Sequence, residues 1–185
     1  VGNLALSIGI NLAKSALAGK VNGKLVDLTQ QLKDNDKVEI ITFSSDEGKM
    51  IFWHSSSHIM AQAVQELFPS AKIAIGPSID SGFYYDFDVP NPFTPEDLVK
   101  IEKQCYKIIA GKIPFIRKEC LRKEVLDYFE KKSEIYKIEL INEIEGDPSI
   151  YCQGRWQDLC RGPHVPHTGI IKAIKLLSCA GAYWR

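Results

Sequence analysis

The pattern of hydrophobic and polar positions predicts a small α+β unit at the start of the chain. Apolar residues recur at helical spacing from Leu4 to Leu17, where the helix is expected to end. Asn22 and Gly23 follow at the tip of a short hairpin, because this pair tolerates the positive φ angles of a type I′ turn. Lys37–Ile41 is the predicted closing strand.

A polar stretch, Ser44–Lys49, is the predicted linker to a larger second part, so the expected domains are residues 1–43 and 44–185. In that part, helical spacing predicts a helix over Ile51–Phe68, and Thr94 with Pro95 has the composition of a helix start. The other expected elements are a strand at Lys72–Ile75, an aromatic strand at Gly82–Asp88, a helix near Glu124–Lys131 and short strands from Tyr136 to Arg185.

Composition fits a globular protein of the cytoplasm. Of 185 residues, 45% are apolar and 25% are charged, and no apolar run approaches the ~20 residues that a membrane span needs. Five cysteines without a CxxC pair fit reduced thiols. Lys plus Arg (23) equals Asp plus Glu (23), so RNA binding would have to be local. The candidate positions are Arg155, Arg161, Lys172, Lys175 and Arg185.

Two pairs of residues at short spacing carry the candidate chemistry. His54 and His58 lie four residues apart on the predicted helix, on one face and away from its apolar stripe. Cys160 and His164 lie in a loop that contains two prolines and a glycine. Together these four could form a tetrahedral zinc site, although each histidine could instead be a hydrogen-bonded structural residue. His167 fits the set least well and is expected to be a loop residue.

Other residues have more than one interpretation. Lys137 alone resembles an exposed lysine in a strand. Asp158 shares a face with Cys160 if that segment is a strand, and otherwise forms a turn through its own backbone. Cys152 and Cys179 are expected to be small core residues.

Several motifs, in order, resemble the N-terminal region of bacterial threonyl-tRNA synthetase. They are His54–Ala63, Ile75–Pro77, Gly82–Asp86, Asp158–Pro166 and Ala180–Arg185. The resemblance implies a truncated β-grasp (TGS) unit at residues 1–43, without its first strands. It also implies an α+β editing domain at residues 44–185, with an antiparallel sheet and packed helices, called the second additional domain.

In that family the second additional domain hydrolyses seryl-tRNA made in error on threonine tRNA. Serine lacks one methyl of threonine, so a pocket that activates threonine can reject serine by only about 1–3 kcal/mol. A second site is therefore needed that hydrolyses the seryl-tRNA formed in error. The resemblance implies tRNA carrying serine as the partner. The catalytic core, with its ATP, magnesium and zinc and the contacts of a homodimer, would lie beyond Arg185. We therefore expect a fragment, as the start at Val1 also suggests.

The resemblance also implies the site. His54, His58, Lys137, Cys160 and His164 are its expected catalytic group, with His54 and Lys137 activating water and stabilising the oxyanion. Asp158 is expected to hold the serine ammonium and Tyr85 to line the pocket. The four possible zinc ligands named above are expected to work without metal. Ser56 is a departure, since many relatives have cysteine or alanine there.

Two alternatives stay open at this point. One is a zinc-stabilised RNA-binding module without catalysis, which a chelator would unfold. The other is a free-standing trans-editing protein, which the small first unit and the abrupt chain start argue against.

Overall fold

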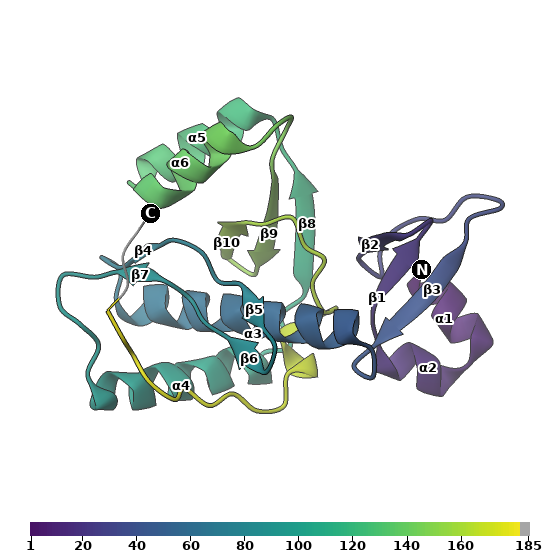
Figure 1. Ribbon diagram of the computed structural model, residues 1–185, viewed down its shortest axis with the longest axis horizontal. Coiled ribbons are helices and arrows are strands. Elements are labelled where there is room, and N and C mark those ends of the chain that lie inside the picture. Colours follow the sequence, from purple (N-terminus) through teal and green to yellow (C-terminus); the bar gives the residue numbers. More distant parts are fainter. Residues whose placement is uncertain (182–185) are drawn as a thin grey trace.

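The computed structural model describes residues 1–181, and its first unit (residues 1–42) is a three-stranded antiparallel sheet with two short helices (Figure 1). The strand order is β2-β1-β3, and the β1–β2 hairpin turns at Asn22 (φ 50°) and Gly23 (φ 82°), as predicted. The elements are α1 (Gly2–Ile8), α2 (Ile10–Ser15), β1 (Ala16–Val21), β2 (Lys24–Val26) and β3 (Val38–Thr42).

The single helix predicted over Leu4–Leu17 is wrong. Gly9 adopts an extended conformation that separates α1 from α2, and the chain enters β1 at Ala16. The first four residues of β1 are buried, and the strand pairs with both β2 and β3. Burial and strand pairing therefore override the helical spacing of the apolar residues.

The second part of the chain is mixed α+β, with antiparallel strands and packed helices, which confirms the predicted fold class. One sheet has the order β10-β9-β8, and two small pairs are β4-β7 and β5-β6. The elements are α3 (Asp46–Leu67), β4 (Lys72–Ile73), β5 (Ser78–Ile79), β6 (Gly82–Phe83), β7 (Phe87–Asp88), α4 (Pro95–Ala110), β8 (Phe115–Glu119), α5 (Arg122–Lys131), α6 (Ile135–Glu143), β9 (Ser149–Gln153), β10 (Trp156–Leu159) and a 3₁₀ turn, η1 (Thr168–Ile170).

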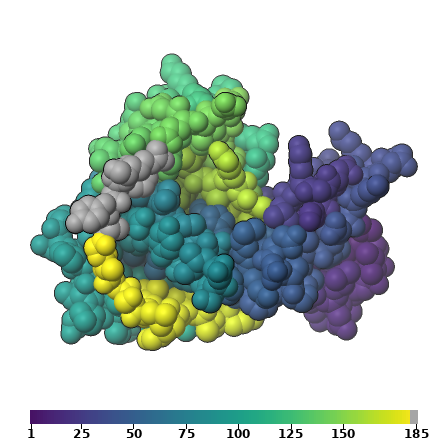
Figure 2. All heavy atoms as spheres, viewed as in Figure 1, coloured from purple at the N-terminus to yellow at the C-terminus, as the bar shows by residue number. Residues whose placement is uncertain are grey.

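The expected linker is the start of α3. The Ser45 hydroxyl accepts a hydrogen bond from the Gly48 N–H at 3.0 Å, and two acidic residues occupy the first helical turn. These are the residue types that satisfy free amides and complement the positive end of a helix. The helix therefore leads almost directly out of β3, and the first unit projects as a lobe at one end of the molecule (Figure 2).

Helix α3 is the centre of the core rather than an amphipathic cover. It runs between α4 and the β10-β9-β8 sheet (Figure 1), and every residue from Ser55 to Val64 is buried. The face that carries His58 is therefore as enclosed as the apolar face. A polar run, Ser55–His58, is brought into the interior by the packing on both sides.

Three further segments differ from the sequence-based expectation. The chain from Ile135 to Glu143 is helix α6, because Lys137 and Ile141, four residues apart, both point into the protein. The aromatic strand is reduced to the short β6 and β7. Cys179 is exposed, whereas Cys152 is buried as predicted.

Helix α4 agrees with its prediction: Thr94 caps it, Pro95 opens it, and Asp97 completes a capping box. Arg185 and the end of the Ala180–Arg185 motif lie outside the described residues. Among residues 1–181, no helix is both long and apolar enough to cross a membrane.

Candidate functional site

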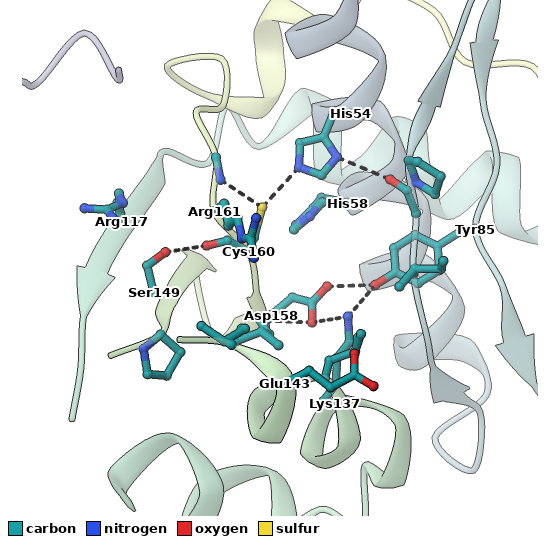
Figure 3. Close-up of a pocket in the computed structure, with 18 of the residues that line it drawn as sticks. His54, His58, Tyr85, Arg117, Lys137, Glu143, Ser149, Asp158, Cys160 and Arg161 are labelled. Carbon is teal, nitrogen blue, oxygen red and sulfur yellow. Dashed lines mark hydrogen bonds and ion pairs between the residues drawn. The ribbon is translucent and has the colours of Figure 1, made fainter. Parts of the chain in front are cut away.

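The residues expected to form the site surround one cleft of about 850 Å³ (Figure 3). His54 and His58 come from α3, Lys137 from α6 and Asp158 from β10. Tyr85 and Cys160, which the sequence also predicted for the site, line the cleft as well. His164 lies behind Cys160 and is 1% exposed. His167 lies outside the cluster, as predicted.

The Cys160 thiol lies between two imidazole rings. Its Sγ is 3.1 Å from His54 Nε2 and 3.3 Å from His164 Nε2, and it accepts a hydrogen bond from the Gly162 N–H at 3.2 Å. Burial raises the pKa of this thiol to about 12, so Cys160 is neutral near pH 7 and carries one proton. That proton can be donated to only one of the two nitrogens.

The tautomers of both rings follow from their other partners. His54 Nδ1 lies 3.2 Å from the Gly76 carbonyl, which can only accept, so Nδ1 carries the proton and Nε2 is the acceptor. His164 Nδ1 lies 3.0 Å from Ser55 Oγ, whose single proton goes to the Ile51 carbonyl at 2.7 Å. His164 Nδ1 is therefore also a donor. Two unprotonated Nε2 atoms face one thiol proton.

All three rings of the cluster are held neutral. Burial lowers the pKa of His54, and it lowers the pKa values of His58 and His164 well below the ordinary range. The ring centroids are 4.3–4.8 Å apart, so a charge on one ring would oppose a charge on the next. The site thus offers proton acceptors rather than cations on this side.

A buried ion pair lies on the other side of the cleft. Lys137 Nζ is 2.8 Å from Asp158 Oδ1 and donates to Tyr85 Oη at 3.1 Å, and Tyr85 Oη donates to Asp158 Oδ2 at 2.7 Å (Figure 3). Both charged side chains are 3% exposed or less. The expectation of an exposed strand lysine is therefore wrong: Lys137 lies on a helix and is buried opposite a carboxylate.

Glycine at position 76 allows Tyr85 to reach this pair. A Cβ atom at Gly76 would overlap the Tyr85 ring, while the Gly76 carbonyl holds both His54 and the Ser57 hydroxyl. One small residue therefore brings the aromatic segment against α3. Within the motif Ile75–Pro77, Gly76 contributes through its backbone carbonyl, and Ile75 and Pro77 line the cleft beside it.

The four clustered residues fit a metal ion by type and by placement. The ligand atoms of His54, His58, Cys160 and His164 lie within 4.8 Å of one another, and imidazole with thiolate is a set that zinc accepts. His58 Nδ1 is buried and has no hydrogen-bond partner among the described residues. A zinc ion held by all four would have its tetrahedral coordination filled by protein atoms and would stabilise the fold, as in structural zinc sites.

Sequence reasoning missed several residues that shape the site. Ser55 fixes the His164 tautomer and accepts a hydrogen bond from the Val165 N–H at 3.0 Å, and Arg117 adds positive charge to the cleft lining. Arg161, named from the sequence as a candidate RNA-binding residue, also lines the cleft. Ser55 stands beside His54 in the polar run, a signal that could have found it. The contribution of Arg117 depends on the packing of β8 and leaves no local signal.

Two parts of the chain match known domain families. Residues 1–42 match the TGS domain, and residues 149–182, which contain β9, β10 and the Cys160–His164 loop, match the threonyl and alanyl tRNA synthetase second additional domain. These matches show a TGS domain at residues 1–42 and part of a second additional domain at residues 149–182.

The resemblance to the N-terminal region of threonyl-tRNA synthetase is confirmed by relatives that match over nearly the whole chain. Threonine–tRNA ligases of Desulforamulus reducens and Pelobacter propionicus are 55% and 53% identical over 98% and 100% of this chain. That of Carboxydothermus hydrogenoformans is 52% identical over 98%. The chain spans 29% of the length of each of these relatives.

Replacing Lys137 by methionine tests the buried pair. Lys137→Met keeps the length of the side chain but leaves the Asp158 carboxylate buried without its cation, so the free energy of unfolding in urea should fall by about 3–5 kcal/mol. Lys123→Met, at an exposed lysine of α5, is the control and should stay within about 0.5 kcal/mol of wild type. Equal losses in the two variants would contradict the role of the pair.

Acid should destabilise the folded protein through the histidine cluster. The unfolded histidines take up protons below about pH 6.5, whereas the folded rings, whose pKa values are lowered, do not. The contribution of the neutral histidines to the free energy of unfolding is therefore fully present above this pH. Below it, the free energy of unfolding falls by about 1.4 kcal/mol per pH unit for each proton taken up on unfolding. Urea unfolding between about pH 7 and 5.5 measures the slope.

His58→Gln should reduce that slope by close to one proton, while Lys123→Met should leave it as in wild type. A free energy of unfolding that does not change across this range would show that the rings are not held neutral.

Proposed function

We propose that the cleft hydrolyses the ester that joins serine to the 3′ end of threonine tRNA. The support comes from the match of residues 149–182 to the second additional domain and from the chemistry of the cleft. The observation that carries the proposal is the surplus of proton acceptors: two imidazole Nε2 atoms share one thiol proton. One nitrogen is left to act as a base.

His54 is the base in this proposal. His164 does not line the cleft and is 1% exposed, so Cys160 donates its proton to His164 Nε2. His54 lines the cleft, and its Nε2 is then free to take a proton from water. Because burial lowers the pKa of His54, the ring is neutral and ready to accept at pH 7.

Lys137 and Asp158 bind the two ends of the reacting group. An ammonium has three donors, and Lys137 uses two, toward Asp158 and Tyr85, which leaves one for the developing oxyanion. A carboxylate has about four acceptor positions, and Lys137, Tyr85 and the Leu159 N–H fill three on Asp158. The fourth accepts from the serine ammonium. Tyr85 stays protonated, because burial raises the pKa of its phenol.

The reaction balances with water as the only co-reactant. The water oxygen bonds to the ester carbonyl carbon as His54 Nε2 takes its proton. The bond to the ribose oxygen then breaks, and that oxygen receives the proton from His54. The products are serine and tRNA with a free terminal hydroxyl. Threonine carries one more methyl than serine, and we propose that the cleft excludes it sterically.

His54→Ala tests the assigned base. Removing a positioned general base should lower the turnover of seryl-tRNA by about 10²- to 10⁴-fold. His167→Ala is the matched control, because it removes a histidine outside the cluster and should leave turnover unchanged. Threonyl-tRNA should remain intact with every variant. Unchanged hydrolysis in His54→Ala would refute the role of His54, and equal cleavage of the two substrates would refute the sieve.

We further propose that the cleft works without a bound metal. His54, Cys160 and His164 each have hydrogen-bond partners within the protein, and the atoms of the cluster left without one among the described residues are His54 Nε2, which the thiol proton does not reach, and His58 Nδ1. The alternative is a zinc-stabilised RNA-binding module, and the clustering of four ligand atoms is the observation that favours it.

Metal analysis of protein purified without added zinc distinguishes the two. We expect far less than one zinc per chain, and we expect a chelator to leave both the thermal transition and seryl-tRNA hydrolysis unchanged. Close to one zinc per chain, with unfolding by the chelator, would establish the zinc-stabilised alternative.

A further inference from the structure

The loop that carries Cys160 and His164 belongs to the second part of the chain, but a residue of the first unit contacts it. It follows β10 and belongs to no helix or strand before η1. Gly162, in the middle of the loop, has φ 68°, a conformation that favours glycine, and a Cβ atom there would overlap the Tyr151 phenol. Tyr151 of β9 therefore packs directly under the loop. Its ring centroid is also 4.5 Å from that of His164.

A carboxylate of the first unit connects these two pieces. Asp27 follows β2 at the edge of the first unit that faces β8 (Figure 1). Its Oδ2 accepts a hydrogen bond from Tyr151 Oη at 2.7 Å, and its Oδ1 accepts one from the His164 N–H at 3.1 Å. One side chain thus holds both the platform under the loop and the backbone of a residue in the cluster.

These are strong contacts by their chemistry. A charged acceptor makes shorter and stronger hydrogen bonds than a neutral one, and both donors belong to residues that are 1% exposed. The negative charge of Asp27 also contributes to raising the pKa values of Tyr151 and Cys160, after burial, which places Asp27 within electrostatic reach of the thiol. The pKa of Arg117 is raised, against the lowering effect of burial, chiefly by its hydrogen bond to Glu119 and to a smaller extent by Tyr151 and Asp27.

Further contacts of the first unit with the second part lie at the start of α3. Lys20 pairs with Glu47 at 3.2 Å, and Gly48 packs against the Thr42 backbone. These contacts hold the units together without touching the cluster. Asp27 differs because its partner is the backbone of His164 itself. A displacement of about 1 Å at a reacting group can cost about a hundredfold in rate, so such a contact affects turnover as well as assembly.

We propose that Asp27 is a positioning residue through which the first unit sets the Cys160–His164 loop for hydrolysis. The inference rests on the proposed function, because it assigns Asp27 a role in that reaction. It also makes a claim that does not depend on the reaction: without the Asp27 carboxylate, the loop moves and the Cys160 thiol becomes more accessible.

Asp27→Asn is the test, since it keeps the shape of the side chain and removes the charge and one acceptor. We expect the turnover number for seryl-tRNA to fall about tenfold to a hundredfold, with little change in KM. Alkylation of Cys160 by iodoacetamide should accelerate relative to Cys179, an exposed cysteine that serves as the internal reference. Peptide mass spectrometry gives this ratio. Asp34→Asn, at an exposed aspartate of the same β2–β3 connection, is the matched control and should behave as wild type.

Tyr151→Phe is the second variant, and it is used for the same two measurements if Asp27→Asn does not fold. It removes the same hydrogen bond from the other side, so it should change both readouts in the same direction. The double variant should be less impaired than the product of the two single effects, because both remove one interaction.

The outcomes separate the two proposals. If wild-type protein does not cleave seryl-tRNA but Asp27→Asn still accelerates Cys160 alkylation, the hydrolytic function fails and the positioning of the loop stands. If turnover and the alkylation ratio both match those of Asp34→Asn, Asp27 does not position the loop. A lower melting temperature with both readouts unchanged would make Asp27 a structural anchor only, which also overturns the proposal.

Discussion

The cleft depends on one buried charge and its partner. Lys137 lies on α6 and Asp158 on β10, and their side chains meet at 2.8 Å where both are almost fully buried. A buried cation is costly unless a carboxylate faces it, so α6 and β10 can pack only with these two side chains in register. Tyr85 closes the group from a third segment. The same pair that orders the packing leaves a cation facing the cleft.

The sequence predicts much of the secondary structure and most of the cluster. The Asn22-Gly23 hairpin and the capped α4 follow from local rules, because turn and cap chemistry depends on a few adjacent residues. His54 and His58 share a helix face, and their spacing shows it. Residue type suggested that they join Cys160 and His164, the resemblance implied the same group, and the structure brings the four together, with 106 positions between His54 and Cys160.

Most of the errors have their cause in tertiary packing. Lys137 resembles a surface residue until α6 places it opposite Asp158. The polar start of α3 is a separate case, because Ser45 caps the helix through a contact only three residues along the chain. The change from α2 to β1 at Ala16 reflects strand pairing with β3, which lies more than fifteen residues further along the chain. Local spacing carries no information on such partners, so Asp27 could not be assigned a role before the fold was known.

The residues of the site are far apart in the sequence, and this separation determines at which stage of folding the site can form. His54 meets Cys160 across 106 residues, and Asp27 meets the His164 backbone across 137. Contacts of this range form late, because the loops between their ends must close first. A chain emerging from the ribosome has α3 long before the Cys160–His164 loop is made. During synthesis His54 therefore lacks Cys160, and the Ser55–His58 run lacks its cover by the β10-β9-β8 sheet, until β9 and β10 dock.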